Sequence, residues 1–195
     1  MTQNHNAREV INTVMKNTEN IKNMDHFVDF HTHILPSMDD GSPDILISTE
    51  MLKSLKEQGV KTVILTPHFY TDREDLQDFL NRRSVAFKTL QPIADQFDIE
   101  VIPACEMYLT DYIFNYENIT QLCINSKKYL LTELPFAYHF SNSTIDKISR
   151  LIANLNVVPI LAHIERYPQL IKDTEYLCRL INMGCLTQIN LESLT

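Results

Sequence analysis

Glycine is scarce in this chain, with only Gly41, Gly59 and Gly184 among 195 residues. Three isolated glycines cannot build a G-x-G-x-x-G turn or a glycine-rich loop that surrounds a phosphate group with backbone amides. The sequence therefore excludes the nucleotide-binding motifs that depend on such loops.

Cysteine is also sparse, and no C-x-x-C pair or disulfide-rich pattern occurs. None of the four cysteines is followed six residues later by arginine, which excludes the nucleophile-and-phosphate loop of cysteine-dependent phosphatases. Because free cysteine packs as a small hydrophobe, we expect buried free thiols at Cys105, Cys123, Cys178 and Cys185.

The chain lacks both an excess of positive charge and a long apolar run. Its formal net charge of −8 argues against a nucleic-acid binder that relies on a basic surface. No apolar run approaches the roughly 20 residues that span a membrane. Residues 1–25 lack the apolar core and cleavage site of a signal peptide. We therefore expect a cytoplasmic protein with no nucleic-acid partner and no membrane span.

The composition suits one globular domain with a substantial core, since 44% of the residues are hydrophobic. Residues 1–25 are polar and rich in Asn, Thr and Lys, which predicts an N-terminal tail. The folded domain is then expected over residues 26–195.

Apolar runs alternate with helix-like segments from residue 26 onward. Six runs resemble buried strands: Phe27–Phe30, Thr62–Thr66, Ile99–Ala104, Tyr129–Thr132, Val157–Ala162 and Leu186–Asn190. Helices are expected between them: from an N-cap at Ser42 to Gly59, over residues 73–96, around Ile145–Leu155, and from Leu170 to Gly184. The alternation predicts a parallel sheet covered by helices, arranged either as an open doubly wound sheet or as a barrel.

Five of the six runs lead into a histidine or a glutamate. In chain order these residues are His31 with His33, His68, Glu106, Glu133 and His163. Strand alternation places the side chains of His31 and His33 on one face. The carboxyl ends of the strands in a parallel barrel share one side, where active sites are built.

Each of these residues has an ordinary alternative role, such as a loop histidine, a glutamate paired with lysine or a satisfied core histidine. Together, however, buried imidazoles and carboxylates are costly unless a cation neutralises them. Mixed nitrogen and oxygen ligands suit two or three divalent ions. Such a site activates water and holds a phosphoryl group.

Two further features follow the histidines. Asp39-Asp40-Gly41 adds carboxylates close to His33, and spacing alone does not separate Asp39 from Asp40. Arg166 lies three residues after His163, and its guanidinium matches the geometry of phosphate oxygens. The alternative for Arg166 is a surface salt bridge with Glu165 or Asp173.

These residues resemble a known family. The segments are Asp29–His33, Asp39–Gly41, Thr66–His68, Glu106–Tyr108, Glu133 and Ala162–Tyr167. They are similar to the polymerase-and-histidinol-phosphatase (PHP) superfamily, and within it to the bacterial manganese-dependent protein-tyrosine phosphatases associated with capsule and exopolysaccharide synthesis. The resemblance runs from about residue 26 onward, and the strings His163–Tyr167 and Gly184–Asn190 are specific for that branch.

The resemblance implies a distorted, TIM-like (β/α)7 barrel with a site for two to three Mn²⁺ ions, with iron or zinc as alternatives. By this resemblance, His31, His33 and Glu106 bind one ion. Glu106 bridges to a second ion, which Glu133 and His163 complete. Asp40 and His68 hold the third, so that Asp40 and not Asp39 occupies the ligand position. Arg166 matches the arginine that orients phosphate, and we assign catalysis to Arg166 and His163.

The chain also departs from the family pattern. It carries seven of nine ligand positions, and a seventh strand with a Ser-Asp-x-His-type motif and a second arginine does not follow. We therefore expect an incomplete barrel of about six parallel strands, with an unpaired edge where the last strand is missing.

The implied activity is metal-dependent hydrolysis of a phosphomonoester without a covalent cysteine intermediate. The implied substrate is a phosphotyrosine protein, such as a bacterial tyrosine kinase of capsule or exopolysaccharide synthesis, and an oligomer is compatible with the sequence. Two alternatives stay open: a PHP phosphatase for a small phosphate ester of the histidinol-phosphate type, and a truncated, non-catalytic vestigial domain.

Overall fold

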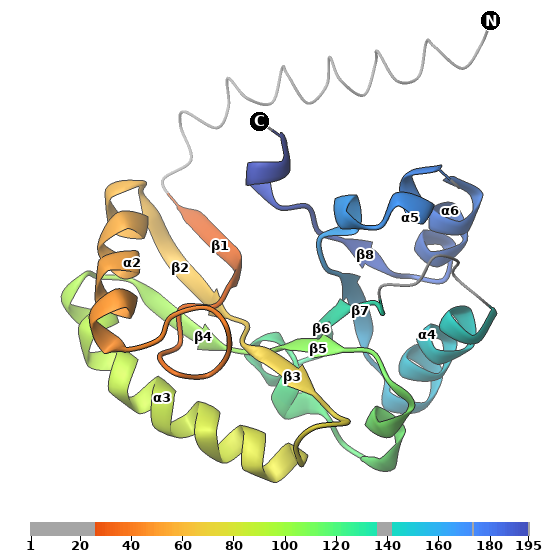
Figure 1. Ribbon diagram of the computed structural model, residues 1–195, viewed down its shortest axis with the longest axis horizontal. Coiled ribbons are helices and arrows are strands. Elements are labelled where there is room, and N and C mark those ends of the chain that lie inside the picture. The colour runs from red at the N-terminus through yellow and green to blue at the C-terminus, as the bar shows by residue number, and fades with distance from the viewer. Residues whose placement is uncertain (1–25, 136–141, 173, 195) are drawn as a thin grey trace, which may run out of the picture.

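A computed structural model describes residues 26–135, 142–172 and 174–194, and it shows parallel strands that alternate with helices (Figure 1). The strands are β1 (Phe27–Thr32), β2 (Val60–Leu65), β3 (His68–Tyr70), β4 (Glu100–Pro103), β5 (Glu106–Tyr108), β6 (Tyr129–Glu133), β7 (Val158–Leu161) and β8 (Leu186–Thr187). The α-helices are α2 (Ile45–Glu57), α3 (Leu76–Gln96), α4 (Asn142–Leu155), α5 (Pro168–Lys172) and α6 (Thr174–Asn182). Short 3₁₀ turns are η1 (Asp111–Asn115), η2 (Thr120–Leu122), η3 (Ile124–Ser126), η4 (Ile164–Arg166) and η5 (Leu191–Leu194). The predicted tail, residues 1–25, lies outside the described residues.

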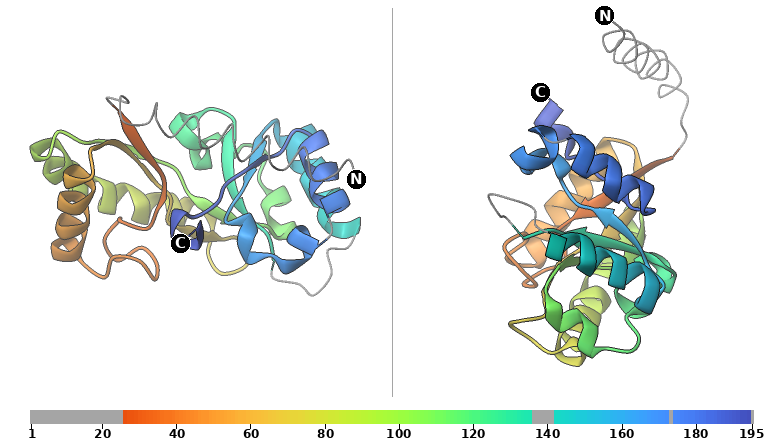
Figure 2. Two further views of the ribbon diagram at one scale, coloured as in Figure 1. Left: turned by 90° about the horizontal axis from the view of Figure 1, so that it is seen from above. Right: turned by 90° about the vertical axis from the view of Figure 1, so that its right-hand side faces the viewer.

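The strands form two parallel sheets, one in the order β1-β2-β4 and one in the order β3-β5-β6-β7-β8. Two segments pass from the first sheet into the second, because β2 leads into β3 and β4 leads into β5. Figures 1 and 2 show the resulting halves: α2 and α3 accompany the first sheet, and α4, α5 and α6 accompany the end of the second. Within the described ranges no sheet closes on itself, and the edge strands β1 and β4 of the first sheet and β3 and β8 of the second each pair on one side only.

The prediction of a parallel α/β fold is confirmed, but the prediction of about six strands is wrong in detail. Two short strands that the runs did not predict, β3 and β5, follow directly after β2 and β4, separated from them by breaks at Thr66–Pro67 and Ala104–Cys105, so that His68 and Glu106 begin new strands. Proline has no N–H to donate to a ladder. The amides of Ala104 and Glu106 instead donate to the carbonyls of Leu65 and Pro67. The last run is strand only over Leu186–Thr187.

The helix boundaries also differ from the prediction. Asp44, not Ser42, caps α2, because its carboxylate accepts hydrogen bonds from the first free amides of the helix. The Ser42 hydroxyl is buried instead and bonds to Ser48. Gly59 follows α2 with φ +83°, a conformation that suits the glycine predicted to end this helix. The helix expected up to Gly184 corresponds to α5 and α6, which lie on either side of residue 173, outside the described residues.

Most buried apolar side chains form one large cluster beneath the helices. A smaller cluster of Leu131, Ile160 and Ala162 lies on β6 and β7 and just beyond, and Phe30 of β1 packs against it. β1 is hydrogen-bonded in the first sheet, and the Phe30 side chain links it to the second sheet. None of the helices within the described ranges has the length and hydropathy that crossing a bilayer requires.

A buried arginine fixes the connection between β4 and β5. Arg83 of α3 is 8% exposed, and its guanidinium donates to the carbonyls of Ala104 and Gln121 at 2.7 and 2.8 Å. Burial lowers the pKa of this guanidinium from its ordinary value. Since Ala104 lies two residues before Glu106, Arg83 holds the backbone from which the Glu106 side chain projects.

We predict that Arg83→Met lowers the free energy of unfolding by about 3 kcal/mol, because two carbonyl groups lose hydrogen bonds from a charged donor. The neighbouring Arg82→Met is the matched control: the Arg82 side chain is 45% exposed, pairs with Glu74 and donates one longer bond of 3.3 Å to the Met38 carbonyl, so its loss is expected to cost less than about 1 kcal/mol. Urea unfolding of both variants measures the difference. Equal destabilisation by the two substitutions would contradict the role of Arg83.

Candidate metal centre

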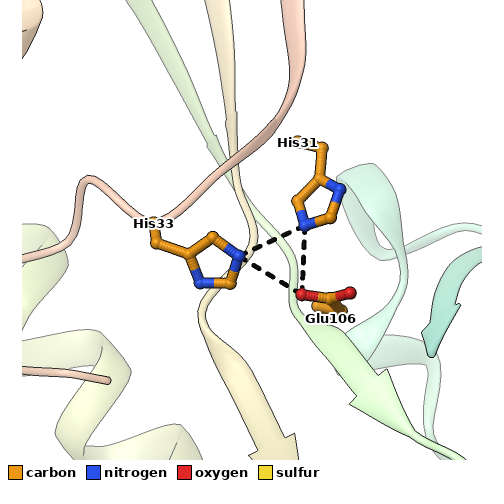
Figure 3. Close-up of side chains that lie close together, drawn as sticks. All are labelled: His31, His33 and Glu106. Atoms are coloured by element: carbon orange, nitrogen blue, oxygen red, sulfur yellow. Dashed lines mark hydrogen bonds and ion pairs between the residues drawn. The ribbon is translucent and has the colours of Figure 1, made fainter. Parts of the chain in front are cut away.

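His31 and His33 converge on one carboxylate, as Figure 3 shows. Their Nε2 atoms lie 3.2 Å apart, and the Oε2 atom of Glu106 lies 3.0 Å from Nε2 of His31 and 3.2 Å from Nε2 of His33. The prediction that the two histidines share a face is therefore confirmed. His31 belongs to β1 and Glu106 opens β5, so the interruption between the two sheets brings these residues together.

The loop after His33 distinguishes Asp39 from Asp40. Asp39 Oδ2 lies 2.6 Å from Nδ1 of His33 and also accepts the backbone N–H of His68 at 2.9 Å. Asp39 therefore orients two other candidate residues from behind. The side chain of Asp40 is 86% exposed, and its Oδ1 lies 3.7 Å from Nε2 of His68. Gly41 is required here because a Cβ would collide with His33.

Glu106 is the centre of the cluster. Its side chain is 1% exposed, and its second oxygen, Oε1, lies 2.8 Å from Nε2 of His163. His68 Nδ1 lies 3.3 Å from Glu106 Oε2 and 3.6 Å from Glu133 Oε2. Glu133 Oε1 lies 3.8 Å from Nε2 of His163. The structure thus brings all seven predicted ligands into one continuous cluster.

Three overlapping groups in this cluster have the spacing of metal ligands. They are His31–His33–Glu106, His33–Asp40–His68 and His68–Glu106–Glu133, with the ligand atoms of each group within 4.8 Å of one another. His68 Nδ1 and Glu133 Oε2 are buried without a hydrogen-bond partner among the described residues. Because buried acceptors are costly when unsatisfied, both atoms fit a role as ligands of a cation.

The charges of the cluster also favour a cation. Burial alone raises the pKa of Glu106, but hydrogen bonds from His163, His31 and His33 dominate and hold it well below its usual range. Burial, followed by the charge of Glu106, raises the pKa of Glu133 to about 7. A divalent ion would stabilise both carboxylates in their charged form.

His33 carries the opposite perturbation. Burial alone lowers the pKa of His33, but its hydrogen bonds to Asp39 and Glu106 outweigh that effect and raise the pKa to about 10. Burial also dominates at His68 and lowers its pKa. A proton on His33 neutralises part of the negative charge, and a metal ion would take its place, since ligands bind metals in the deprotonated form.

Gln188 is a residue whose role the residue patterns did not reveal. Its Oε1 lies 3.1 Å from Nδ1 of His31 and accepts the backbone N–H of His163 at 2.7 Å. Since an amide oxygen only accepts, Nδ1 of His31 carries the proton and Nε2 faces Glu106. In the sequence, Gln188 stands out only as a member of the string Gly184–Asn190, which is specific for the family branch.

His163 has a left-handed backbone, with φ +34° and ψ +55°. A residue other than glycine in this region costs about 1–3 kcal/mol, and such strain is concentrated at functional sites. The hydrogen bond to Gln188 holds this conformation. It lets the chain turn sharply after β7 while the His163 ring points toward Glu106.

Arg166 ends η4 and is exposed. Its backbone N–H donates to the carbonyl of His163 at 2.9 Å, which links its position to that residue. Glu165 Oε1 lies within hydrogen-bond distance of the Asn190 amide and the Ser193 hydroxyl. Asp173, the other suggested partner of Arg166, lies outside the described residues. The phosphate role of Arg166 stays a prediction.

Comparison with known proteins identifies relatives of this chain. The family described as "Capsular polysaccharide synthesis, CpsB/CapC" matches residues 27–195. The tyrosine-protein phosphatase CpsB of Streptococcus pneumoniae is 34% identical over 170 residues, which cover 84% of this chain and 67% of the relative. The tyrosine-protein phosphatase YwqE of Bacillus subtilis is 28% identical over 181 residues, covering 86% of this chain and 65% of YwqE.

A solved structure is also similar. It is described as "Crystal structures of YwqE from Bacillus subtilis and CpsB from Streptococcus pneumoniae, unique metal-dependent tyrosine phosphatases". The TM-score is 0.68 at 27% sequence identity, over 84% of this chain and 66% of the solved one. The chain therefore spans about two thirds of the length of the relatives it matches.

We predict that Glu106→Gln weakens Mn²⁺ binding at least about 100-fold, because loss of residues that merely orient ligands already costs 10- to 100-fold. Glu100→Gln on the exposed start of β4 is the control and is expected to bind as the original chain does. Titration calorimetry measures both affinities. Unchanged binding in Glu106→Gln would remove Glu106 from the ligand set.

We also predict that Gln188→Leu weakens Mn²⁺ binding about 10- to 100-fold without unfolding the chain, since the His31 ring and the His163 backbone lose their common partner. Gln77→Leu, which removes an exposed amide that donates to Asn81, serves as the control. Metal titration together with far-UV circular dichroism distinguishes lost orientation from lost fold. Native affinity in Gln188→Leu would exclude the orienting role.

Proposed function

This chain belongs to the CpsB/CapC family of capsular polysaccharide synthesis, and we propose that it is a metal-dependent tyrosine-protein phosphatase like the relatives described above. The observation that carries the proposal is the convergence of four histidines on the buried carboxylate of Glu106. This cluster lies within the region that the chain shares with those phosphatases.

The proposed cofactor is manganese, bound as two to three ions, with iron or zinc as alternatives. His31, His33 and Glu106 would hold one ion, and Glu106, Glu133 and His163 a second. His68 and Asp40 would hold the third. Bound ions would supply Lewis-acid activation of water and neutralise charge on the phosphoryl group.

The protein residues divide the remaining work between them. Asp39 and Gln188 keep the His33 and His31 rings oriented through their Nδ1 atoms. We assign phosphate binding to Arg166, whose guanidinium presents donors that match phosphate oxygens. His163, which contacts Glu106, directly precedes η4, and Arg166 ends that turn. One short segment would therefore supply both a metal ligand, His163, and the phosphate-binding residue, Arg166.

We further propose that the two sheets form part of a distorted barrel, and that residues 26–195 belong to one PHP-type phosphoesterase domain. The packing of Phe30 against the cluster of Leu131, Ile160 and Ala162 supports this arrangement, because it joins β1 to the second sheet through side chains. The proposed substrate is a phosphotyrosine protein, with a bacterial tyrosine kinase of capsule synthesis as the partner and the cytoplasm as the compartment.

The cysteines argue against the other chemistry used by tyrosine phosphatases. Cys105, Cys123 and Cys185 are buried as predicted, but Cys178 is exposed on α6, so the expectation of a buried thiol is wrong there. Burial raises the pKa of the Cys123 and Cys185 thiols to about 11, which keeps them protonated and poorly nucleophilic at neutral pH.

The test is hydrolysis of a phosphotyrosine peptide and of a small alkyl phosphate. We expect kcat/KM for the peptide to fall at least about 100-fold when a chelator removes the metal, because the ions supply several kcal/mol of transition-state stabilisation. Iodoacetamide and Cys178→Ser are expected to leave the rate unchanged.

Three outcomes contradict the proposal in different ways. Activity that survives the chelator but is lost on alkylation would indicate a cysteine enzyme. A preference for the small alkyl phosphate would favour the histidinol-phosphate type. Absence of turnover on both esters, in protein shown by metal analysis to hold manganese, would favour a non-catalytic domain.

A further inference from the structure

The strands β3, β5 and β6 have two chemically different faces. Phe69, Met107 and Thr132 are completely buried on one face, against the large core. His68 and Glu106 project from the other face, where alternation also places the residues two positions further along each strand. Those residues are Tyr70 and Tyr108, and both are half-buried.

The strand register makes these two tyrosines neighbours. His68 pairs with Glu106 across β3 and β5, and Tyr70 pairs with Tyr108 in the same ladder. Tyr108 in turn pairs with Glu133 of β6. A row formed by Tyr70, Tyr108 and Glu133 therefore lies directly beside the row that contains His68 and Glu106.

The two phenol rings form an aromatic wall next to the candidate metal centre. Their centroids are 5.5 Å apart with a tilt of 49°, and the Tyr70 ring lies 5.1 Å from the His68 ring. The guanidinium of Arg73 lies 4.1 Å from the centre of the Tyr70 ring and holds it from a further side. Neither tyrosine hydroxyl has a hydrogen-bond partner among the described residues.

We infer that Tyr70 and Tyr108 bind the aryl ring of the substrate and so select aryl phosphates over alkyl phosphates. This inference rests on the proposed phosphatase function and names the residues that give it specificity for tyrosine. Aromatic rings pack favourably when offset or tilted, with centroids 4.5 to 7 Å apart.

The spacing suits such a ligand. Two residues along a strand span about 6.6 Å, so the aromatic wall begins about that far from the His68 and Glu106 row. The aryl ring of phosphotyrosine is attached to phosphorus through a single oxygen. When the phosphate lies at the metal centre, beside His68 and Glu106, the aryl ring therefore reaches the neighbouring row that contains Tyr70 and Tyr108. A short alkyl ester would not offer a flat surface to the wall.

The test compares two phosphonates that cannot be hydrolysed, phenylphosphonate and methylphosphonate, as ligands of the manganese-loaded chain. Tyr108→Leu removes the ring and keeps an apolar side chain, while Tyr108→Phe removes only the hydroxyl. Tyr112→Leu is the control, because Tyr112 is 57% exposed on η1, away from the paired row. Titration calorimetry yields both affinities and the manganese stoichiometry for each variant.

We expect Tyr108→Leu to weaken phenylphosphonate binding about 5- to 10-fold, as expected for loss of one aromatic contact. In Tyr108→Leu, the affinity for methylphosphonate and the manganese stoichiometry should stay within about twofold of those of the original chain. Tyr108→Phe and Tyr112→Leu should bind both phosphonates as the original chain does. Equal loss for both phosphonates, or an original chain without preference for phenylphosphonate, would overturn the inference. Because binding needs no turnover, an inactive chain that still prefers phenylphosphonate would contradict the proposed function but support the aromatic wall.

Discussion

The buried carboxylate of Glu106 is the constraint on which the rest of the site depends. It lies almost without exposure among His31, His33, His68 and His163, each within 3.3 Å of one of its oxygens. An isolated carboxylate at this depth would be strongly destabilising, and surrounding imidazoles or cations must compensate for it. The strands and loops that deliver these histidines are therefore energetically coupled to one another through a single side chain.

The interruption between the two sheets makes this convergence possible. β1 supplies a histidine from the end of the first sheet, while β3 and β5 supply His68 and Glu106 from the beginning of the second. A continuous β2–β3 or β4–β5 strand would keep these residues within one regular ladder. Instead the backbone shifts near Pro67 and Pro103, and Arg83 holds the second shift by binding the Ala104 carbonyl.

A second layer of polar residues gives the cluster its orientation. Asp39 binds the His33 ring and the His68 amide, and Gln188 binds the His31 ring and the His163 amide. Each of these residues therefore holds one ring and one backbone group that belong to different parts of the chain. The arrangement explains how residues separated by more than 150 positions, such as His31 and Gln188, act on the same centre.

The sequence alone determined the chemical type of the site, because His31, His33, His68, Glu106, Glu133 and His163 each follow an apolar run. It also determined the parallel α/β class through the alternation of those runs with helical segments. It did not reveal the eight short strands or the start of α2 at Asp44, since proline breaks and local capping compete with simple periodicity.

Only the tertiary structure decided which of two adjacent aspartates faces which histidine. Asp39 and Asp40 are equivalent in spacing, but the loop that Gly41 permits to lie against His33 turns one toward Nδ1 of His33 and the other toward His68. The pairing of Tyr70 with Tyr108 likewise depends on the register between strands that are distant in sequence. Long-range packing fixes these contacts, and no local pattern encodes them.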